Sequence, residues 1–288
     1  MRLKFAVIGG DRRSVLLCRM LAQDGHRIHS FALERAELPE EIPKAGCLES
    51  ALYGADCVVL PTPAERSGLL NAPYAALPCR IDELLPSLWP GQLLCGGRFS
   101  PELRQTADRG GLRVLDLMES PGFVTMNAAI TAEGAVGLLL QESERTLWGS
   151  RVLICGWGRI GRLLAWRLLA LGAQVTVAAR GSAHRAEARA LGCEAAEYPA
   201  LPELLGFCDF VVNTVPARVL TPAMLCCLRE DALLLELASP PGGFDRTAAE
   251  NMGVRTLAAP GLPGRCAPWS AAALMRDEIL RALAQEED

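Results

Sequence analysis

The sequence predicts an α/β protein built from two doubly wound, Rossmann-like domains with a cleft between them and a long linking helix. Three observations carry this prediction. Residues 151–179 have the pattern of a strand, a glycine turn, a helix and a strand, and Phe5–Ile8 begins a second strand-turn-helix unit. Short apolar runs typical of strands buried in a parallel sheet recur in both halves. A chain of 288 residues is also long enough for about two domains.

The clearest local signal is the glycine-rich turn after the apolar run Val152–Cys155. In a G-x-G-x-x-G turn the first glycine permits the tight turn and the second lets the backbone approach a pyrophosphate. The third lets the following helix lie against the strand, so that the helix N-terminus faces the phosphates. We therefore expect a dinucleotide at Gly156, Gly158, Arg159, Ile160 and Gly161.

The next strand, Gln174–Ala179, ends where the adenosine ribose of the dinucleotide is expected. NAD-binding domains place Asp or Glu here, whereas this chain continues with Arg180, Ser182 and His184. A guanidinium with neighbouring donors suits a 2′-phosphate, which predicts NADP as the cofactor. The alternative is that Arg180 is a solvated residue that opens a loop.

Three later strands end in small, rigid or polar loops, where a doubly wound sheet places its ligand. Asn213 and Thr214 are predicted to hydrogen-bond the nicotinamide ribose or carboxamide. The remaining predicted contacts are Val215, Pro216, Ala238 and Ser239 for the cofactor, and Gly261, Leu262 and Pro263 for the substrate.

We expect residues 1–121 to form an α/β domain that binds substrate or partner, and residues 147–265 to form the NADP-binding domain. The second strand-turn-helix unit carries Asp11, which would repel phosphate. Thr62, between two prolines at the end of a strand, lies where a ligand-facing loop is expected, although the prolines also fit simple chain punctuation.

A linking helix is predicted over residues 122–146. Asn127 and Thr131 fall on one stripe of this helix, and Glu133 is the single carboxylate in its apolar stretch. From the pattern alone, Glu133 fits a solvent-facing position better. Residues 266–288 are predicted to form a C-terminal helix that packs back on the N-terminal domain.

Composition limits the classes of function. The net charge of −4 gives no sign of nucleic-acid or anionic-membrane binding. Eleven cysteines with no C-x-x-C pair are typical of reduced thiols in a cytoplasmic protein, and three histidines offer no zinc-site spacing. No signal peptide is expected, nor any apolar run of the ~18 residues that cross a membrane.

Together the motifs resemble the family of dipicolinate synthase A subunits, from the synthase with which spore-forming bacteria make pyridine-2,6-dicarboxylate. The resemblance covers nearly the whole chain. Its matching stretches are Ile8-Gly9-Gly10-Asp11 with Arg13, Asn127 through Thr131 to Gly134, the glycine turn, Ala179-Arg180 with Ser182-Ala183-His184, Asn213-Thr214-x-Pro216, Leu237-Ala238-Ser239 with Pro241-Gly242-Gly243 and Asp245, and Ala259-Pro260-Gly261-Leu262-Pro263-Gly264. Pro240 departs from the pattern, since the family is expected to carry Arg there. That change puts an anion contact at this loop in doubt.

The resemblance implies NADP-dependent oxidation of 4-hydroxy-tetrahydrodipicolinate, or its dehydrated dihydro form, to dipicolinate during sporulation, in the cytoplasm of the mother cell. It also implies a flavoprotein as the second subunit of the synthase. Arg13 is the candidate for holding a substrate carboxylate, because a planar fork binds carboxylate in a bidentate way. Asp11 and Glu133 are the candidates for taking the proton lost on aromatisation. A homodimer is expected only because symmetric dimers are common.

Two other functions remain open on the sequence. One is an NADP-dependent dehydrogenase of another small 2-oxo or 2-hydroxy acid. D-2-hydroxy-acid and alanine dehydrogenases use a late histidine, or a lysine and a histidine in the first domain. This chain has no histidine after His184 and only Lys4 and Lys44. The other is a non-catalytic NADP-binding subunit that senses redox state or positions a flavoprotein.

Overall fold

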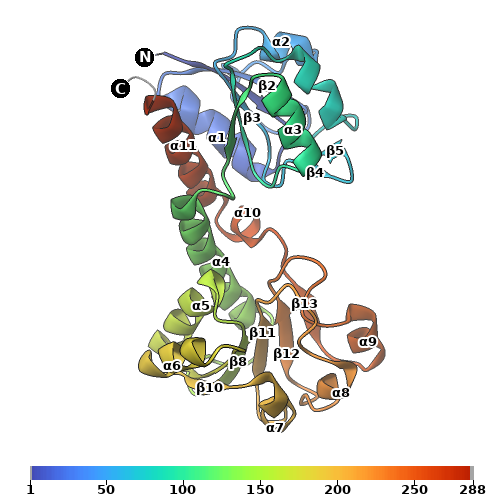
Figure 1. Cartoon of the computed structure of the whole chain (residues 1–288), viewed down its shortest axis with the longest axis vertical. Coiled ribbons are helices and arrows are strands. Elements are labelled where there is room, and N and C mark those ends of the chain that lie inside the picture. The colour runs from blue at the N-terminus through green and yellow to red at the C-terminus, as the bar shows by residue number, and fades with distance from the viewer. Residues whose placement is uncertain (1, 286–288) are drawn as a thin grey trace. The chain divides into compact units, whose positions relative to one another are not determined.

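The computed structural model describes residues 2–285, which divide into two compact units. The first unit comprises the residues up to Asn127 and those from Gly264 onward, and the second is Ala128–Pro263. Each unit holds one fully parallel sheet (Figure 1). The prediction of two doubly wound α/β domains is thereby confirmed.

The sheet of the first unit has the strand order β2-β1-β3-β6-β7, which is the flavodoxin-like 2-1-3-4-5 order. Its strands are β1 Lys4–Ile8, β2 Arg27–Phe31, β3 Cys57–Val59, β6 Leu93–Gly96 and β7 Arg113–Asp116. Around it lie α1 Arg12–Gln23, α2 Leu48–Leu52, α3 Pro101–Arg109, the hairpin of β4 Glu65–Arg66 and β5 Leu69–Leu70, the 3₁₀ helices η1 Ile81–Glu83 and η2 Leu85–Ser87, and α11 Pro268–Ala284.

Alternation along the strands builds two apolar layers in this unit. Phe5 and Val7 of β1 face α1, whereas Ala6 and Ile8 face the layer of α2 and α3. The C-terminal helix α11 lies beside α1 and adds Ala272, Met275 and Ile279 to the first of these layers (Figure 1).

The sheet of the second unit has the order β10-β9-β8-β11-β12-β13, which is the dinucleotide-binding order 3-2-1-4-5-6. Its strands are β8 Arg151–Cys155, β9 Gln174–Ala178, β10 Glu194–Ala196, β11 Phe210–Asn213, β12 Leu233–Glu236 and β13 Thr256–Ala258. Its helices are α5 Arg159–Ala170, α6 Ser182–Ala190, η3 Tyr198–Ala200, α7 Leu201–Leu205, α8 Pro222–Leu225 and α9 Arg246–Asn251. Chain order reverses between β8 and β11, so a ligand is expected at the carboxyl ends of these two strands.

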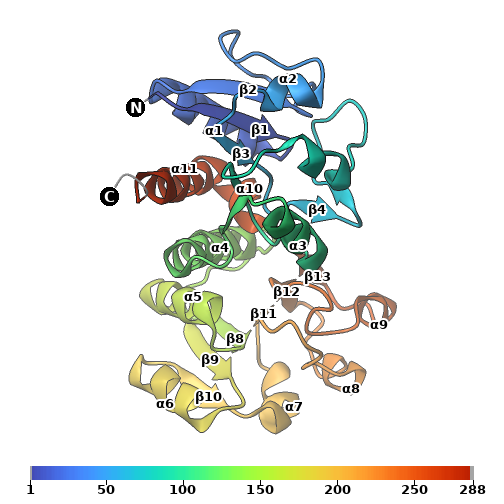
Figure 2. The ribbon, with the colours of Figure 1, turned by 45° about the horizontal axis from the view of Figure 1, so that its top comes forward.

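The two faces of this sheet are covered by different helices. Ile154 and Val212 pack with residues of α4, α5 and α6, while Leu153 and Val211 pack with α7, α8 and α9. Figures 1 and 2 show α5 and α6 on one side of the sheet and α8 and α9 on the other. Full burial on both faces explains why the strands are continuous apolar runs in the sequence.

The linking helix is α4, Pro121–Gln141, which begins in the first unit and ends in the second. The predicted end at residue 146 is wrong. Beyond Gln141 the hydroxyl of Ser143 accepts the N–H of Arg145 at 3.2 Å, a local turn that competes with helix. A short helix, α10 Leu262–Cys266, makes the return connection.

Among the described residues, α4 is the one helix long and apolar enough to span a membrane by length and composition, with a mean hydropathy of 1.5 over 18 residues. The expectation that no such apolar run exists is therefore wrong. Its hydropathy comes partly from small alanines. Ala132, Ala135 and Leu139 are buried in the core of the second unit, as in a core helix.

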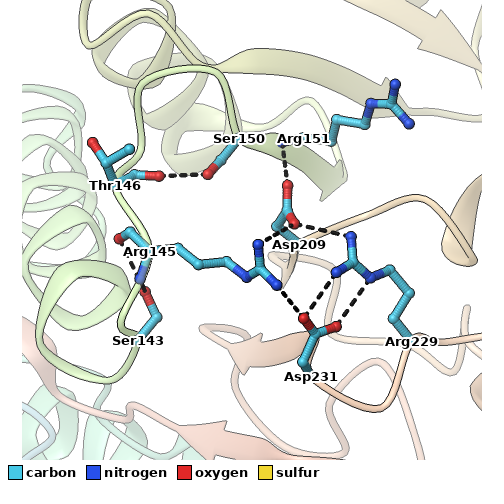
Figure 3. A network of polar contacts seen from close by, with 8 residues as sticks. All are labelled: Ser143, Arg145, Thr146, Ser150, Arg151, Asp209, Arg229 and Asp231. Carbon is cyan, nitrogen blue, oxygen red and sulfur yellow. Dashed lines mark hydrogen bonds and ion pairs between the residues drawn. The ribbon is translucent and has the colours of Figure 1, made fainter.

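A polar network fastens the amino-terminal edge of the second sheet (Figure 3). Asp209 accepts the N–H of Arg151 at 2.8 Å and pairs with Arg229 at 3.1 Å and Arg145 at 3.6 Å. Asp231 accepts from the same two arginines. The network lies at the edge opposite the carboxyl ends of the strands, away from the expected ligand.

Candidate dinucleotide site and polar cluster

The three motif glycines are required for three different reasons. Gly156 has φ +105°, and a Cβ there would lie 2.5 Å from Thr214 Oγ1. A Cβ on Gly161 would lie 2.3 Å from the carbonyl oxygen of Gly156, so any side chain there would clash with the turn that leads into α5. A Cβ on Gly158 would meet nothing within 4 Å. The space above Gly158 is what a pyrophosphate needs.

The N-terminus of α5 is ready for an anion. Its N-cap is Gly158, and no side chain caps it. The helix has 12 residues, long enough for its aligned peptide dipoles to favour negative charge at this end. Arg159 is exposed beside it and Ile160 is half-buried. The residues present therefore fit a dinucleotide pyrophosphate.

The residues predicted to meet the 2′-phosphate come together at the end of β9. Arg180, Ser182 and His184 are all exposed, and the His184 ring lies over Gly181, its Nδ1 3.6 Å from where a Cβ would stand. Gly181 is the N-cap of α6, which again has no side-chain cap. Three donor side chains and an open helix N-terminus fit a phosphate, and the strand end carries no carboxylate.

Arg185, which sequence reasoning missed, holds this turn in shape. Its Nη1 donates to the carbonyl oxygens of Ala179 at 2.8 Å and Arg180 at 2.6 Å, and its Nη2 pairs with Glu197. In the sequence, Arg185 is one of two arginines in this helix, and no motif distinguishes it from the other.

At the other half of the sheet, Asn213 and Thr214 are the residues predicted to hydrogen-bond the nicotinamide ribose or carboxamide, and the structure shows the partners of their side chains. Asn213 is fully buried, and its Nδ2 donates to Val215 O at 2.9 Å and to Glu236 Oε1 at 2.7 Å. Its Oδ1 accepts the N–H of Val215. Thr214 Oγ1 donates to Cys155 O at 2.9 Å. Both side chains are engaged within the protein, because neighbouring strands supply partners that sequence does not reveal.

Other predicted contacts follow directly after these strands. Val215 is half-buried and Pro216 exposed after β11, while Ala238 and Ser239 are half-buried after β12. Gly261 is exposed, whereas Leu262 and Pro263 are buried. Leu262 belongs to the core of the second unit, so its side chain serves packing.

In the first unit, Asp11, Arg13 and Thr62 are brought together. Arg13 Nε and Nη2 each donate to Asp11 at 2.9 Å, and Nη2 also donates to Thr62 O at 2.6 Å. Arg13 is 8% exposed. A Cβ on Gly264 would lie 2.9 Å from both Arg13 Nε and Asp11 Oδ2, so the glycine of α10 lies directly on the pair. We call Asp11, Arg13, Thr62 and Gly264 the polar cluster.

Two features of the polar cluster bear on chemistry. Burial raises the pKa of Asp11, but the hydrogen bonds and charge of Arg13, with the charge of Arg66, outweigh this and hold that pKa below its usual value. The hydroxyl Oγ1 of Thr62 is buried without a hydrogen-bond partner among the described residues. An unpaired buried hydroxyl is costly, so Thr62 carries an unmet hydrogen bond at this position.

Glu133 lies elsewhere. It is exposed on α4 and pairs at 3.1 Å with Arg167 in the last turn of α5. Arg167 is about 12 Å along the helix axis from the phosphate-facing end at Arg159. Of the other predicted α4 residues, Asn127 is half-buried and Thr131 is 7% exposed.

Comparisons with known proteins match both the N-terminal and the C-terminal parts of the chain. Residues 4–118 match the model of the N-terminal domain of dipicolinate synthase A subunits. Residues 123–230 match the NAD-binding domain of D-isomer specific 2-hydroxyacid dehydrogenases. The second match makes the chain an oxidoreductase with a nicotinamide dinucleotide domain.

Full-length relatives match as well. The dipicolinate synthase A subunit of Bacillus subtilis (strain 168) is 30% identical over 98% of this chain and 96% of its own. The crystal structure of the A subunit from Bacillus halodurans has a TM-score of 0.87 and 28% identity, covering 98% of both chains. That of the Bacillus subtilis protein has a TM-score of 0.84 and 30% identity, covering 100% of this chain and 98% of that one. The chain belongs to the family of dipicolinate synthase A subunits.

Proposed function

We propose that this chain is the NADP-binding subunit of a dipicolinate synthase and oxidises 4-hydroxy-tetrahydrodipicolinate, or its dehydrated dihydro form, to dipicolinate. Family membership and the dehydrogenase-type domain support the reaction class. Oxidation of the dihydro ring removes one hydride and one proton. NADP+ when bound supplies the hydride acceptor, and the protein must supply a proton acceptor and hold two carboxylates.

The choice of NADP rests on Arg180. It stands at the position where an NAD site has an acidic residue, with Ser182 and His184 exposed beside it. A guanidinium that meets a phosphate forms charge-assisted hydrogen bonds, roughly twice as strong as neutral ones.

The observation that carries substrate recognition is the polar cluster of the first unit. Arg13 is buried, and its Nε and Nη2 donate to Asp11 and Thr62, which fixes the guanidinium and leaves Nη1 to meet a substrate carboxylate. In this proposal the first unit binds the substrate and the second unit binds the dinucleotide.

Asp11 is the better of the two predicted proton acceptors. It lies beside Arg13 and Thr62 in the polar cluster, whereas Glu133 pairs with Arg167 far from the phosphate-facing end of α5. The lowered pKa keeps Asp11 ionised at neutral pH and able to accept a proton, although a low pKa also weakens it as a base. Asn127 and Thr131 stay predictions as substrate contacts.

We further propose that the chain works in the cytoplasm of a sporulating bacterium with a flavoprotein as its partner. The relatives are named as one subunit of the synthase, which supports the existence of a second one.

The test is a coupled absorbance assay. Purified chain, NADP+ and freshly made 4-hydroxy-tetrahydrodipicolinate are mixed with and without the candidate flavoprotein, and dipicolinate and NADPH are followed together. Equal formation of both products is expected. Turnover only with the partner would make the flavoprotein essential to the reaction. Dinucleotide binding without turnover in either mixture favours another 2-oxo acid substrate or a non-catalytic role.

A further inference from the structure

A buried carboxylate, Glu236, lies at the carboxyl end of β12 and takes part in no predicted role. It is 7% exposed and accepts three hydrogen bonds. Its Oε1 accepts from Asn213 Nδ2 at 2.7 Å and from the N–H of Ala238 at 2.8 Å, and its Oε2 accepts from the N–H of Gly243 at 2.7 Å. Both carboxylate oxygens are therefore occupied by donors of this chain.

Asn213 is the matching residue on β11, the strand beside β12. Its amide joins Glu236 to both the N–H and the C=O of Val215. A Cβ on Gly243 would lie 2.3 Å from the Asn213 amide, and a Cβ on Gly242 would lie 2.9 Å from Glu236 Oε2. The loop after β12 thus packs directly on the pair, and only glycine fits at these two positions.

The pair ties two ligand-edge segments to one rigid pair of strands. Through Asn213 it holds residues 214–216, and through Glu236 it holds residues 238–243. The carbonyl oxygen of Gly243 in turn accepts from the N–H groups of Val219 and Leu220. One side-chain pair therefore sets the backbone of both segments.

The chemistry calls for a carboxylate. Three N–H donors converge on the two oxygens, and a carboxylate only accepts. Glutamine offers one oxygen and one NH₂ group, so one of the three donors would face another donor. A buried hydrogen-bond network with one unpaired donor is costly, because that donor has lost water and gained no partner. The identity of residue 236 is thus fixed by its surroundings.

The two segments lie beyond the switch point between β8 and β11, on the side away from Arg180 and α6. A dinucleotide that crosses this point with its adenosine half over β9 has its nicotinamide half over β11 and β12. We propose that Glu236 is a positioning residue, which acts through Asn213 and the two loops to set the binding of the nicotinamide half. This inference rests on the proposed dinucleotide site.

The competing explanation is that Glu236 merely stabilises the fold. A fold-stabilising role predicts that both halves of the dinucleotide bind less well, in step with the melting temperature. The positioning role predicts a split, because the adenosine half is held by α5, α6 and Arg180, which the pair does not touch.

The experiment compares wild-type protein with Glu236→Gln by calorimetry. NADPH is titrated against 2′,5′-ADP, which lacks the nicotinamide, and NADH against 5′-ADP in parallel. Fluorescence of the bound dihydronicotinamide reports its surroundings. Glu250→Gln, which removes the same charge from the exposed face of α9, is the matched control. If Glu236→Gln does not fold, Asn213→Ala keeps the test, since it releases residues 214–216 and leaves the Ala238 and Gly243 bonds to Glu236.

We expect the affinity for NADPH to fall about 10–100-fold, with altered dihydronicotinamide fluorescence, because displaced loops lose polar contacts to the nicotinamide half. Affinity for 2′,5′-ADP should stay within about twofold, and Glu250→Gln should match wild type on both. Unchanged NADPH binding, or equal loss for both ligands, overturns the inference. If wild-type protein binds none of the four ligands, the proposed dinucleotide site fails first, and that result is distinct.

Discussion

Nη2 of Arg13 lies 2.9 Å from Oδ2 of Asp11 and 2.6 Å from the carbonyl oxygen of Thr62, two residues before and 49 residues after it in the chain. This contact joins the turn after β1 to the segment after β3, and Gly264 lies on top of it. The Asp11–Arg13 pair is therefore both a structural contact and a candidate substrate site. Measurements of stability and of activity distinguish these two roles.

Asp11→Asn should destabilise the protein by about 1–3 kcal/mol, because it leaves the buried Arg13 without its charged partner. The pKa of Asp11 is held below its unfolded value, so its contribution is present above the unfolded pKa and is lost as the pH falls through the folded pKa. Urea unfolding of wild type and Asp11→Asn should therefore differ at pH 7 and converge at low pH. A constant difference down to acid pH would contradict this assignment.

Gly158→Ala and Gly161→Ala form a matched pair within one turn. A Cβ on Gly161 would overlap the Gly156 carbonyl, so its variant should lose about 1–3 kcal/mol of stability. A Cβ on Gly158 meets no protein atom but enters the space of a pyrophosphate, so its variant should keep its melting temperature and bind NADPH at least tenfold more weakly. Thermal melting and calorimetry check both. Tight binding by Gly158→Ala would remove the phosphate site from this loop.

Arg180→Glu should reverse the choice of cofactor. The change removes a charge-assisted partner of the 2′-phosphate, worth about 1.5–3 kcal/mol, and supplies an acceptor for a ribose 2′-hydroxyl. Affinity for NADP+ should fall roughly 10–100-fold, while affinity for NAD+ rises or holds. The control is Arg189→Glu, because Arg189 lies in the last turn of α6, at the far end of that helix from Arg180. A wild-type protein that prefers NAD+ would refute the NADP assignment.

Glu133→Gln should leave kcat/KM within about twofold, because its partner Arg167 is in the last turn of α5 and exposed ion pairs contribute little. Steady-state kinetics of the complete synthase provide the measurement. A fall in kcat/KM of about a hundredfold or more would contradict this and make Glu133 the proton acceptor. In that case Asp11→Asn should retain activity.

Asp209→Ala should cost about 1–3 kcal/mol of stability without changing dinucleotide affinity. The change leaves the N–H of Arg151 without its acceptor and leaves Arg145 and Arg229 with Asp231 as their one shared carboxylate, at the edge of the sheet opposite the ligand (Figure 3). Asp231→Asn, at an exposed position of the same network, should cost less stability than Asp209→Ala. Denaturant melts with NADPH titrations measure both. Weaker binding by Asp209→Ala would mean that this edge communicates with the ligand edge.

Local patterns were enough for the glycine turn and the sheet. The run before Gly156 is apolar because β8 is buried on both faces. Gly161 meets the Gly156 carbonyl within the turn itself, whereas the close neighbour of Gly156 is Thr214, on the segment after β11. The ends of helices were harder to predict. The linking helix ends at Gln141 because the Ser143 hydroxyl accepts a backbone N–H in a local turn that competes with helix. The periodicity of apolar residues does not reveal such a hydrogen bond.

By itself the sequence determined the two-domain α/β class, the glycine-rich turn proposed to hold the dinucleotide phosphates and the absence of an acidic residue after β9. These features depend on short stretches whose chemistry is complete within themselves. Tertiary structure decided what the polar side chains do. Asn213 is a plausible nicotinamide ligand until Glu236, 23 residues away, occupies its amide. Arg13 is a lone cation until Thr62 and Gly264 close around it. A polar side chain forms hydrogen bonds with the groups that lie within about 3 Å of it, and only the folded chain determines which groups these are.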